Sequence, residues 1–446
     1  MTVGIVLAAL LFTIPAGPAC AAPAADASPR AEERNRPLRQ LLDSAGRAEW
    51  PTVAAPEASP IPAADERYWI MVRASTPQER TRISEAGMPM DEITADKVSG
   101  IVHVNTVKQL EAWGFKIDRR IPMTEYAQQF LRDFPPEDAA YRNYQEMLDT
   151  LQGLAQANPG LVSLFSIGKS IAGREIWAVR FNTTEFGAAP SAKPGAVFMG
   201  THHAREHLST EVPLLLAQYL AANQDRPDIR KLLETRDVYV IPLVNPDGSE
   251  YDIATGKYKW QRKNMRVNPD KYIGVDLNRN YGYLWGGPGS SGSTWSETYR
   301  GPSAFSEPET QAVKNFIEAR SNLKTLLSFH SYSELVLYPW GGSDKPIANA
   351  KDLQAFQAIA RQMAKFTGYT DEQASALYVA CGDTTDWAYA SRGIFAFTIE
   401  LTPKGSSGGG FYPGSGVIEK VAQVNIQASL YLISLSDDPH QAIGKR

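Results

Sequence analysis

Cysteine is nearly absent from this chain, since only Cys20 and Cys381 occur among 446 residues. So few cysteines exclude a small scaffold that is held together by disulfides. An excess of positive charge is also lacking: 45 basic residues face 49 acidic ones and no basic run is interleaved with aromatic residues, which excludes nucleic acid as an expected partner. The apolar run at residues 3–14 is too short to span a bilayer, so we expect no membrane-spanning helix.

The N-terminal segment has the composition of a targeting sequence. Residues 3–14 are apolar and small residues follow at 19–21, as at a signal peptidase site, although no Lys or Arg lies near Met1. We therefore expect a signal peptide over residues 1–21 and a secreted protein, extracellular or periplasmic. A lipid anchor on Cys20 is the alternative, but Gly17-Pro18-Ala19 before it matches that signal poorly. Once the signal is removed, Cys381 has no partner, and no internal disulfide is expected.

The length of the chain predicts one large domain preceded by a smaller unit. Residues 22–64 are rich in Ala, Pro and charge and predict a flexible leader. After them, strands are expected at 67–74 and 100–105 and a helix at 106–115, which predicts a small α+β unit over residues 65–120. The basic, proline-bearing segment 117–123 leads into a link over residues 121–138, and we expect a trypsin-like protease to reach Arg119-Arg120 if this link is mobile.

From residue 139 to residue 446, apolar strands alternate with long amphipathic helices. This pattern predicts an α/β domain, with a mixed and mostly parallel twisted sheet covered by helices on both faces. The expected strands are residues 196–200, 237–244, 324–330 and 395–401. One expected helix begins at Ser306, which forms a capping box with Glu309, and a last helix is expected over residues 416–435.

Two potential metal ligands follow the first of these strands, in the stretch "GTHHAREHLS". His203 and Glu206 stand three residues apart, so they can converge on one ion if the chain turns helically there. Taken alone, a histidine and a glutamate at this spacing more often form structural hydrogen bonds than bind a metal ion. His330, at the end of another predicted strand, supplies a third donor at the same edge of the sheet. Two imidazoles and a carboxylate leave a fourth position of zinc open, as catalytic sites require.

Glu400 lies between apolar neighbours in the predicted strand 395–401. Burial of an ionisable group is costly unless the group is paired or used. A carboxylate next to a metal-activated water is a general base for hydrolysis. The motif "GVDLNRNYG" contributes Asp276, Asn278 and Arg279. The Arg279 guanidinium and the neighbouring Asn278 amide together are suited to bind the carboxylate of a ligand. A loop with a solvated arginine is the alternative for this motif.

From about Tyr141 onward, the chain resembles the zinc carboxypeptidases of the funnelin type, and within them the bacterial carboxypeptidase T branch. The shared motifs stand in family order: "HHAREHL", "LVNPDG", "DLNRNYGY", "SAFSEPET", "TDWAY" and "FAFTIE". The resemblance implies the zinc carboxypeptidase fold, one Zn²⁺ in the catalytic domain, and hydrolysis of the C-terminal bond of peptides and proteins. It also implies a zymogen, in which the α+β unit is a prosegment that an activating protease removes. We expect a monomer.

The resemblance also implies the roles of individual residues. The zinc ligands would be His203, Glu206 and His330, and the general base would be Glu400. The substrate carboxylate would be held by Asn278, Arg279 and the mobile Tyr378, with Arg205 in the cleft and Asp276 behind the first zinc histidine.

One role does not transfer in register. The family's oxyanion arginine lies in a motif like Trp-Arg-Lys-Asn-Arg, and here the segment reads "WQRKNMR", so a register without gaps places Met265 at that position. We expect Arg266 to serve if the loop bulges by one residue, with Arg262 as the less favoured alternative.

The pocket floor falls on "CGDTTDW", with Thr385 deepest and Asp383 two residues before it. As in the carboxypeptidase T branch, this implies acceptance of both bulky apolar and basic C-terminal residues. The alternative is a turn in which Asp383 faces solvent.

For the whole protein, the alternatives are a murein or γ-glutamyl peptidase on the same fold and a secreted binding protein without catalysis.

Overall fold

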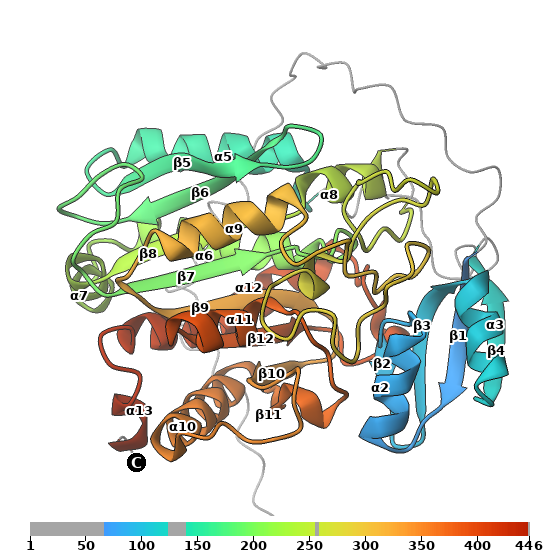
Figure 1. The fold of residues 1–446 in the computed structure, drawn as a ribbon. Helices are drawn as coiled ribbons and strands as arrows, with labels where there is room; N and C mark the ends of the chain where they lie inside the picture. Colours follow the sequence, from blue (N-terminus) through green and yellow to red (C-terminus); the bar gives the residue numbers. More distant parts are fainter. Residues whose placement is uncertain (1–66, 124–139, 255–257, 445–446) are drawn as a thin grey trace, which may run out of the picture. The chain divides into compact units, whose positions relative to one another are not determined.

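The computed structural model describes residues 67–123, 140–254 and 258–444. The expected signal peptide and the leader lie outside the described residues, as does most of the expected link. Residues 67–122 form the smaller unit, with a four-stranded antiparallel sheet in the order β2-β3-β1-β4. Its elements are β1 (Arg67–Arg73), α2 (Pro77–Glu85), β2 (Glu92–Ile93), β3 (Lys97–His103), α3 (Val104–Ala112) and β4 (Ile117–Pro122). The α+β architecture expected from the sequence is therefore present here (Figure 1).

The structure changes two details of this unit. The sequence pattern did not indicate helix α2, which follows the N-cap Thr76. The Thr76 hydroxyl accepts from the amide of Glu79 at 3.2 Å, and the Glu79 carboxylate accepts from the amide of Thr76 at 3.0 Å. The expected protease-sensitive link at Arg119-Arg120 is wrong, because both residues lie in β4. This strand pairs with β1 through Met71↔Arg119 and Ile70↔Arg120, so the backbone hydrogen bonds of the sheet fix the bond between them. The unit consequently extends to Pro122 rather than residue 120.

The larger sheet has eight strands in the order β11-β10-β12-β9-β7-β8-β6-β5. Four of its seven strand pairs are parallel, and the antiparallel pairs join β5 to β6, β6 to β8, and β10 to β12. The strands are β5 (Val162–Lys169), β6 (Glu175–Phe181), β7 (Gly195–Gly200), β8 (Asp237–Ile241), β9 (Leu323–Ser331), β10 (Leu335–Tyr338), β11 (Thr370–Gln373) and β12 (Phe395–Leu401). The predicted mixed, mostly parallel sheet is confirmed, and the four strands missed by the sequence pattern lie toward its two edges.

Helices cover both faces of this sheet. Helices α6 and α12 pack on one face and α9 and α11 on the other, with α5 beside α6 and α10 beside α12 (Figure 1). The helices are α5 (Tyr144–Ala157), α6 (Leu208–Ala222), α7 (Pro227–Thr235), α8 (Pro246–Ile253), α9 (Pro308–Glu318), α10 (Ala350–Thr367), α11 (Thr384–Arg392), α12 (Ile418–Ser434) and α13 (Gln441–Gly444). Short 3₁₀ turns lie at Leu277–Arg279, Ala374–Ala376, Ser406–Gly408 and Ser415–Val417. No helix among the described residues is long and apolar enough to cross a membrane.

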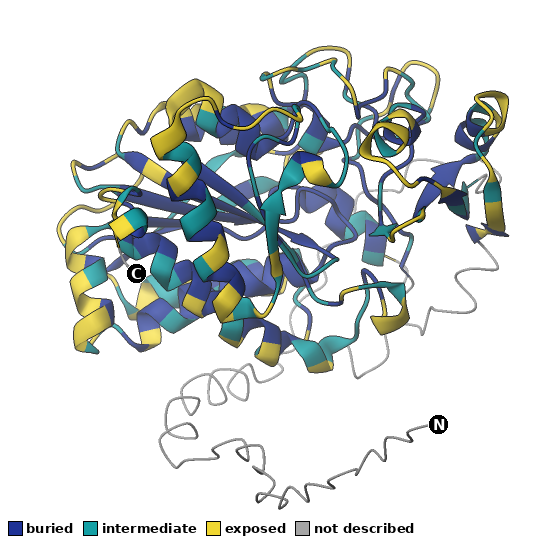
Figure 2. Cartoon of the chain, turned by 90° about the horizontal axis from the view of Figure 1, so that it is seen from below, coloured by how far each residue is buried: buried dark blue, intermediate teal, exposed yellow. Residues whose placement is uncertain are grey.

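Alternation along the strands explains this layering, because successive side chains point to opposite faces. Val197 and Met199 of β7 pack with Phe316 of α9 and Trp387 of α11 in one buried cluster. The central strands β7 and β8 are accordingly buried along their length, while the helices keep an exposed outer side (Figure 2).

The expected capping box of α9 is wrong. Its N-cap is Glu307 rather than Ser306, and no side chain caps the helix there. The Glu309 carboxylate is buried instead, where it accepts from the amide of Ile171 at 2.9 Å and from Asn264 at 3.1 Å. Tertiary hydrogen bonds therefore replace the local one that the spacing suggested.

Candidate active site

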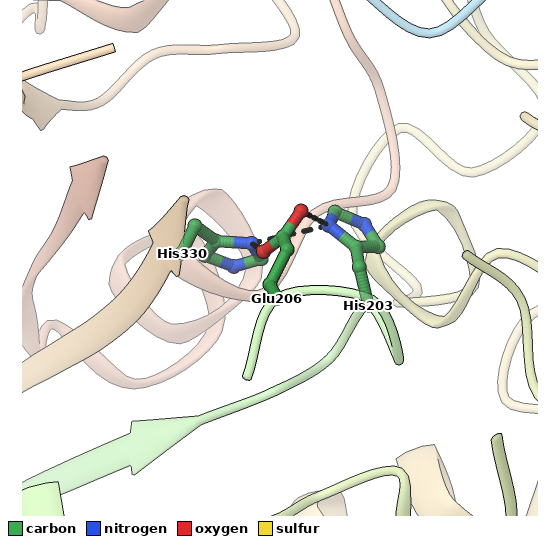
Figure 3. Close-up of side chains that lie close together, drawn as sticks. All are labelled: His203, Glu206 and His330. Carbon is green, nitrogen blue, oxygen red and sulfur yellow. Dashed lines mark hydrogen bonds and ion pairs between the residues drawn. The ribbon is translucent and has the colours of Figure 1, made fainter. Parts of the chain in front are cut away.

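Three side chains converge at the carboxyl ends of parallel strands. His203 and Glu206 lie in the turn between β7 and α6, and His330 is the next-to-last residue of β9 (Figure 3). The Glu206 carboxylate lies between the two imidazoles, 2.8 Å from Nδ1 of His203 and 3.0 Å from Nδ1 of His330. All three residues are buried, and their ligand atoms lie within 4.8 Å of one another.

The tight turn after β7 explains how His203 and Glu206 come close to His330, which lies far along the chain. A Cβ on Gly200 would lie only 1.8 Å from the backbone oxygen of Ser209, so glycine allows the end of β7 to approach the start of α6. The next residue, Thr201, has a φ of 53°, which reverses the chain. His203 and Glu206 consequently face the end of the neighbouring strand β9.

The chemistry of this donor set fits a divalent metal ion. The two Nδ1 atoms lie 3.2 Å apart, and neither can bond the other unless one carries a hydrogen. Burial alone would raise the pKa of Glu206, yet the His203 and His330 imidazoles lower that pKa below its usual range, so the carboxylate is charged. One cation between three such donors satisfies all of them and leaves a position open, which is the ligand pattern of catalytic zinc.

Asp276 supports the site from behind. Its carboxylate lies 3.1 Å from Nε2 of His203, which directs Nδ1 of that ring toward Glu206. The other oxygen accepts from the Arg262 guanidinium at 3.1 and 3.0 Å. Burial alone would raise the pKa of Asp276, but Arg262 and then His203 hold that pKa well below its usual value.

Glu400 stands beside the donor set on the adjacent strand. Strands β12 and β9 are parallel, and their register pairs Glu400 with His330. The side chain is only partly buried because it lines the cavity described next. No hydrogen bond joins its carboxylate to any residue in the described part of the chain. Burial, followed by the charge of Glu206, raises the pKa of Glu400 well above its usual value.

A cavity of about 310 Å³ lies over these residues and contains most of the groups that the sequence predicted. Its lining includes His203, Glu206, Arg262, Asn278, Arg279, Tyr378, Asp383, Thr385 and Glu400. Residues of the smaller unit line it as well, namely Met90, Asp91 and Ile93. Because a cavity of this size accommodates a peptide end, the polar groups around it are positioned to contact one.

The oxyanion arginine that we expected, Arg266, does not line this cavity. Its guanidinium donates to Glu307 at 2.9 Å instead, at the start of α9. Arg262, the less favoured alternative, lines the cavity between Asp276 and the metal donors. The expectation that Arg266 reaches the cavity is therefore wrong, and Arg262 is the arginine of this segment that lines it.

At the far end of the cavity, Arg279 is held by backbone oxygens. Its Nε donates to Gly289 at 2.9 Å and one terminal nitrogen donates to Asn278 at 2.9 Å, while the other lies 3.3 Å from the hydroxyl of Tyr378. The Asn278 side-chain oxygen accepts from the amide of Thr384 at 3.0 Å. Because the terminal nitrogens of a guanidinium each carry two hydrogens, Arg279 can still donate to a negatively charged group that enters the cavity beside Tyr378.

Asp383 does not face solvent, which excludes that alternative. Its Oδ1 caps α11, accepting from the amides of Thr385 at 2.8 Å and Asp386 at 2.9 Å. Its Oδ2 is buried and accepts no hydrogen bond from the residues that the structure describes, although Asp383 lines the cavity. The carboxylate therefore combines a capping role with one oxygen that can receive a donor.

The remaining residues of the histidine-rich stretch have structural contacts. His202 bonds the hydroxyl of Tyr281 at 2.9 Å, and His207 lies 2.9 Å from Asp252. Arg205 is fully buried: it donates to Asp91 of the smaller unit at 2.7 Å and lies over the ring of Phe411. Burial raises the pKa of Asp91 to about 6 although Arg205 and Arg262 oppose the shift. Nothing in the segment "PMDEI" marked Asp91 in the sequence.

A buried His/Glu/His donor set with an acid beside it, at the carboxyl edge of an α/β sheet, defines a metal-dependent hydrolase. A family model described as Zinc carboxypeptidase matches residues 147–428, and the chain belongs to that family. It is a zinc-dependent carboxypeptidase that uses one catalytic zinc and acts on the C-terminal ends of peptides.

Individual relatives agree with this assignment. A zinc carboxypeptidase of Saccharothrix mutabilis subsp. capreolus is 33% identical over 401 residues, which cover 85% of this chain and 91% of that protein. Zinc carboxypeptidase A 1 of Drosophila melanogaster is 36% identical over 276 residues, or 60% of this chain and 63% of the relative. Among solved structures, carboxypeptidase A of Helicoverpa armigera is 24% identical with a TM-score of 0.69, over 86% of this chain and 99% of that one, and shows the same fold.

Proposed function

We propose that His203, Glu206 and His330 hold the catalytic zinc and that Glu400 is the general base of the hydrolysis. The observation that carries this proposal is the register of β9 and β12, which sets Glu400, a residue of the cavity wall, beside His330. An acid at that position is next to any water that the three donors and their ion would hold.

The chemistry that zinc supplies when bound is polarisation of the scissile carbonyl and a lowered pKa of water. Glu400 removes the proton from the attacking water and transfers it to the leaving amine. The Arg262 guanidinium donates to the oxygen that becomes negatively charged as the carbonyl is attacked. Arg279, Asn278 and Tyr378 hold the terminal carboxylate of the substrate, which restricts cleavage to the last peptide bond.

We further propose that the chain is a zymogen and that the smaller unit blocks the cleft. Met90, Asp91 and Ile93 occupy one wall of the cavity, and Asp91 engages the Arg205 guanidinium. Helix α2 also contacts both neighbours of Tyr378: Arg80 donates to the oxygen of Leu377 at 3.2 Å and the amide of Val379 donates to Thr81 at 2.9 Å. The tyrosine is thereby held with its hydroxyl on Arg279, where a substrate carboxylate would bind.

Activation requires a cut after this unit. Since Arg119 and Arg120 are paired in β4, we place the cut between residues 123 and 140.

Secretion is supported by the apolar run and small residues of the N-terminal sequence. A dual preference for apolar and basic C-terminal residues, and with it closeness to the carboxypeptidase T branch, is supported by Thr385 and the unpartnered Oδ2 of Asp383 in the cavity wall.

The test is hydrolysis of peptides that differ only in the C-terminal residue, by intact and proteolytically cleaved chain, with and without a chelator. The cleaved chain is expected to release both Phe or Leu and Lys or Arg, and the chelator is expected to abolish this activity. Equal activity of intact and cleaved chain would contradict the zymogen, and a strict preference for diaminopimelate-like ends would contradict the proposed substrates.

A further inference from the structure

The cavity over the metal donors extends along one face of the large sheet as far as its edge strand, β11. Strands β12, β10 and β11 are neighbours in the sheet (Figure 1). Their register sets Thr398, Leu337 and Glu372 side by side in one row. Residues in register share a face of a sheet, and all three line the cavity, as Glu400 does. The cavity wall therefore contains an acid from β11 in addition to Glu400 and Asp383.

The Glu372 carboxylate has no partner within the chain. No hydrogen bond or ion pair joins it to another residue in the described ranges. The side chain is half-buried. Burial raises the pKa of Glu372, and the positive charge of Arg80 opposes this shift. A carboxylate that is partly removed from water and unpaired is best satisfied by a cation that enters the cavity.

The residue after Glu372 fixes the position of β11. Alternation along the strand directs Gln373 to the other face. Its side-chain nitrogen lies 3.2 Å from the backbone oxygen of Ser343 and 3.1 Å from that of Lys345, both in the segment that follows β10. Glu372 is thus presented from an anchored strand, which sets its direction more firmly than a loop would.

Gly341 relates this acid to the unpartnered oxygen of Asp383. A Cβ on Gly341 would lie 3.3 Å from Oδ2 of Asp383 and 3.6 Å from Cβ of Ala374. Both neighbours line the cavity, and the missing side chain leaves room between them. Since Ala374 follows Glu372 by two residues, the two carboxylates lie on the same side of the cavity, around Gly341.

The wall between the acids and the carboxylate anchor is apolar. Leu377, which precedes Tyr378, lines the cavity together with Leu337. The methylene stem of a C-terminal Lys or Arg can pack on these leucines while its charged end reaches an acid. An apolar side chain can pack on the same leucines, and Glu372 then stays in contact with water at the edge of the sheet. A wall of this kind accepts both classes of side chain.

In the intact chain, a guanidinium of the smaller unit lies beside this wall. Arg80 of α2 donates to the backbone oxygen of Leu377 at 3.2 Å. Its Nε is buried and donates to no residue in the described part of the chain. Removal of the smaller unit takes this cation away, so the Glu372 carboxylate becomes available to a cation of the substrate.

We propose that Glu372 is a specificity-determining residue that binds the basic side chain of a C-terminal Lys or Arg, together with Asp383. The preference for basic ends then comes from two acids on different elements, the edge strand β11 and the start of α11. This inference rests on the proposed function, because it needs a substrate whose carboxylate lies on Arg279.

The test uses the full chain, folded and then cleaved after the smaller unit, with blocked dipeptides that end in Arg, Lys, Leu or Glu. Glu372→Gln keeps the size of the side chain and removes its charge. It should lower the ratio of kcat/KM for Arg to that for Leu about tenfold, mostly through KM. Glu372→Lys reverses the charge, so it should lower this ratio further and raise the ratio of Glu to Leu about fivefold or more.

The matched control is Asp371→Asn, which removes one negative charge from the same strand. Asp371 is in register with Val336 rather than Leu337, so it lies on the opposite face, and it does not line the cavity. The ratio of Arg to Leu should stay within twofold in this variant. The double variant Glu372→Gln with Asp383→Asn should lower the ratio more than either single change.

The outcomes separate this inference from the function on which it rests. A ratio in Glu372→Gln within twofold of the unchanged chain, equal losses for all four C-terminal residues, or the same fall in Asp371→Asn would each overturn the role of Glu372. Release of Leu without release of Arg or Lys by the unchanged cleaved chain would overturn it too, while leaving the zinc-dependent hydrolysis in place. If that chain hydrolyses none of the dipeptides, the proposed function fails and the role of Glu372 with it.

Discussion

At the amino ends of the parallel strands, Asp237 is surrounded by hydrogen-bond donors, whereas at the carboxyl ends Glu400 faces a cavity. The Asp237 carboxylate accepts from the Arg180 guanidinium at 2.6 Å, from the Tyr239 hydroxyl at 2.7 Å and from the Ser191 hydroxyl at 2.9 Å. Burial alone would raise the pKa of Asp237, but the hydrogen bonds from Arg180 and then Tyr239 lower it. This acid is fixed in its charged form.

Glu400 has none of these donors. No hydrogen bond reaches its carboxylate from the described residues, and the negative charge that raises its pKa most is that of Glu206, a predicted zinc ligand. Both acids sit in strands of one sheet, so the difference comes from what surrounds them rather than from the fold. A satisfied acid stabilises the native state, while an acid without donors retains the affinity for protons that a general base needs.

The largest effect is expected when the Glu400 carboxylate, the acid without hydrogen-bond donors, is removed. Glu400→Gln keeps the shape of the side chain but cannot accept the proton of water, so kcat/KM should fall by about a thousandfold or more. The zinc content of the purified protein, measured by elemental analysis, should stay near one per chain. Turnover close to that of the unchanged chain would show that another group is the base.

At Asp237, at the amino end of β8, we expect a loss of stability without a loss of activity. Asp237→Asn leaves the buried Arg180 charge without its partner and should lower the free energy of unfolding by about 3 to 5 kcal/mol. Protein that remains folded should turn over substrate at an unchanged rate, which makes this variant the matched control for Glu400→Gln. Urea unfolding and active-site titration measure the two quantities.

The same substitution has a pH signature. Because the pKa of Asp237 is lower in the native chain than its usual 3.8, the stabilisation is complete above that usual value and is lost as the pH falls through the native one. The stability difference between the unchanged chain and Asp237→Asn should therefore be larger at pH 7 than at pH 3. A difference independent of pH would show that the charge of Asp237 does not contribute.

A third test separates the two arginines of "WQRKNMR". Arg262→Met should lower kcat by about a hundredfold or more if this guanidinium stabilises the oxyanion, whereas Arg266→Met should change kcat less than threefold. Because Arg262 also holds Asp276 behind His203, zinc content must be measured for both variants. A large loss in Arg266→Met alone, with zinc retained, would restore the original expectation.

The sequence could predict what depends on short spacing and on strand patterns. The four central strands, the layers of helices and the grouping of His203, Glu206 and His330 are as expected, because residues at the carboxyl ends of parallel strands meet at one edge. Edge strands such as β11 carry polar residues like Asp371 and Glu372 and have no apolar pattern to detect.

What the sequence could not predict depends on contacts between distant segments. The Arg266 assignment failed because Arg266 pairs with the sequence-distant Glu307, whereas Arg262 pairs with Asp276 behind the metal donors. Arg119 and Arg120 read as an exposed link because β4 is an edge strand with charged residues, which only its pairing with β1 reveals. Asp91 likewise becomes recognisable only when the smaller unit and the large domain are folded together.

The smallest expected effect concerns Asp383, which shares features of both compared acids: one oxygen is satisfied like those of Asp237, and the other is free like those of Glu400. Asp383→Asn keeps an N-cap for α11 while it removes the charge, so the melting temperature should change little. The kcat/KM for C-terminal Lys and Arg should fall about tenfold relative to Phe and Leu, because the free oxygen no longer attracts a cation. Asp383→Ala is the matched comparison, since it removes the cap as well and should lose stability in addition. Equal losses for basic and apolar substrates in Asp383→Asn would mean that the carboxylate serves the helix alone and that basic side chains are recognised elsewhere in the cavity.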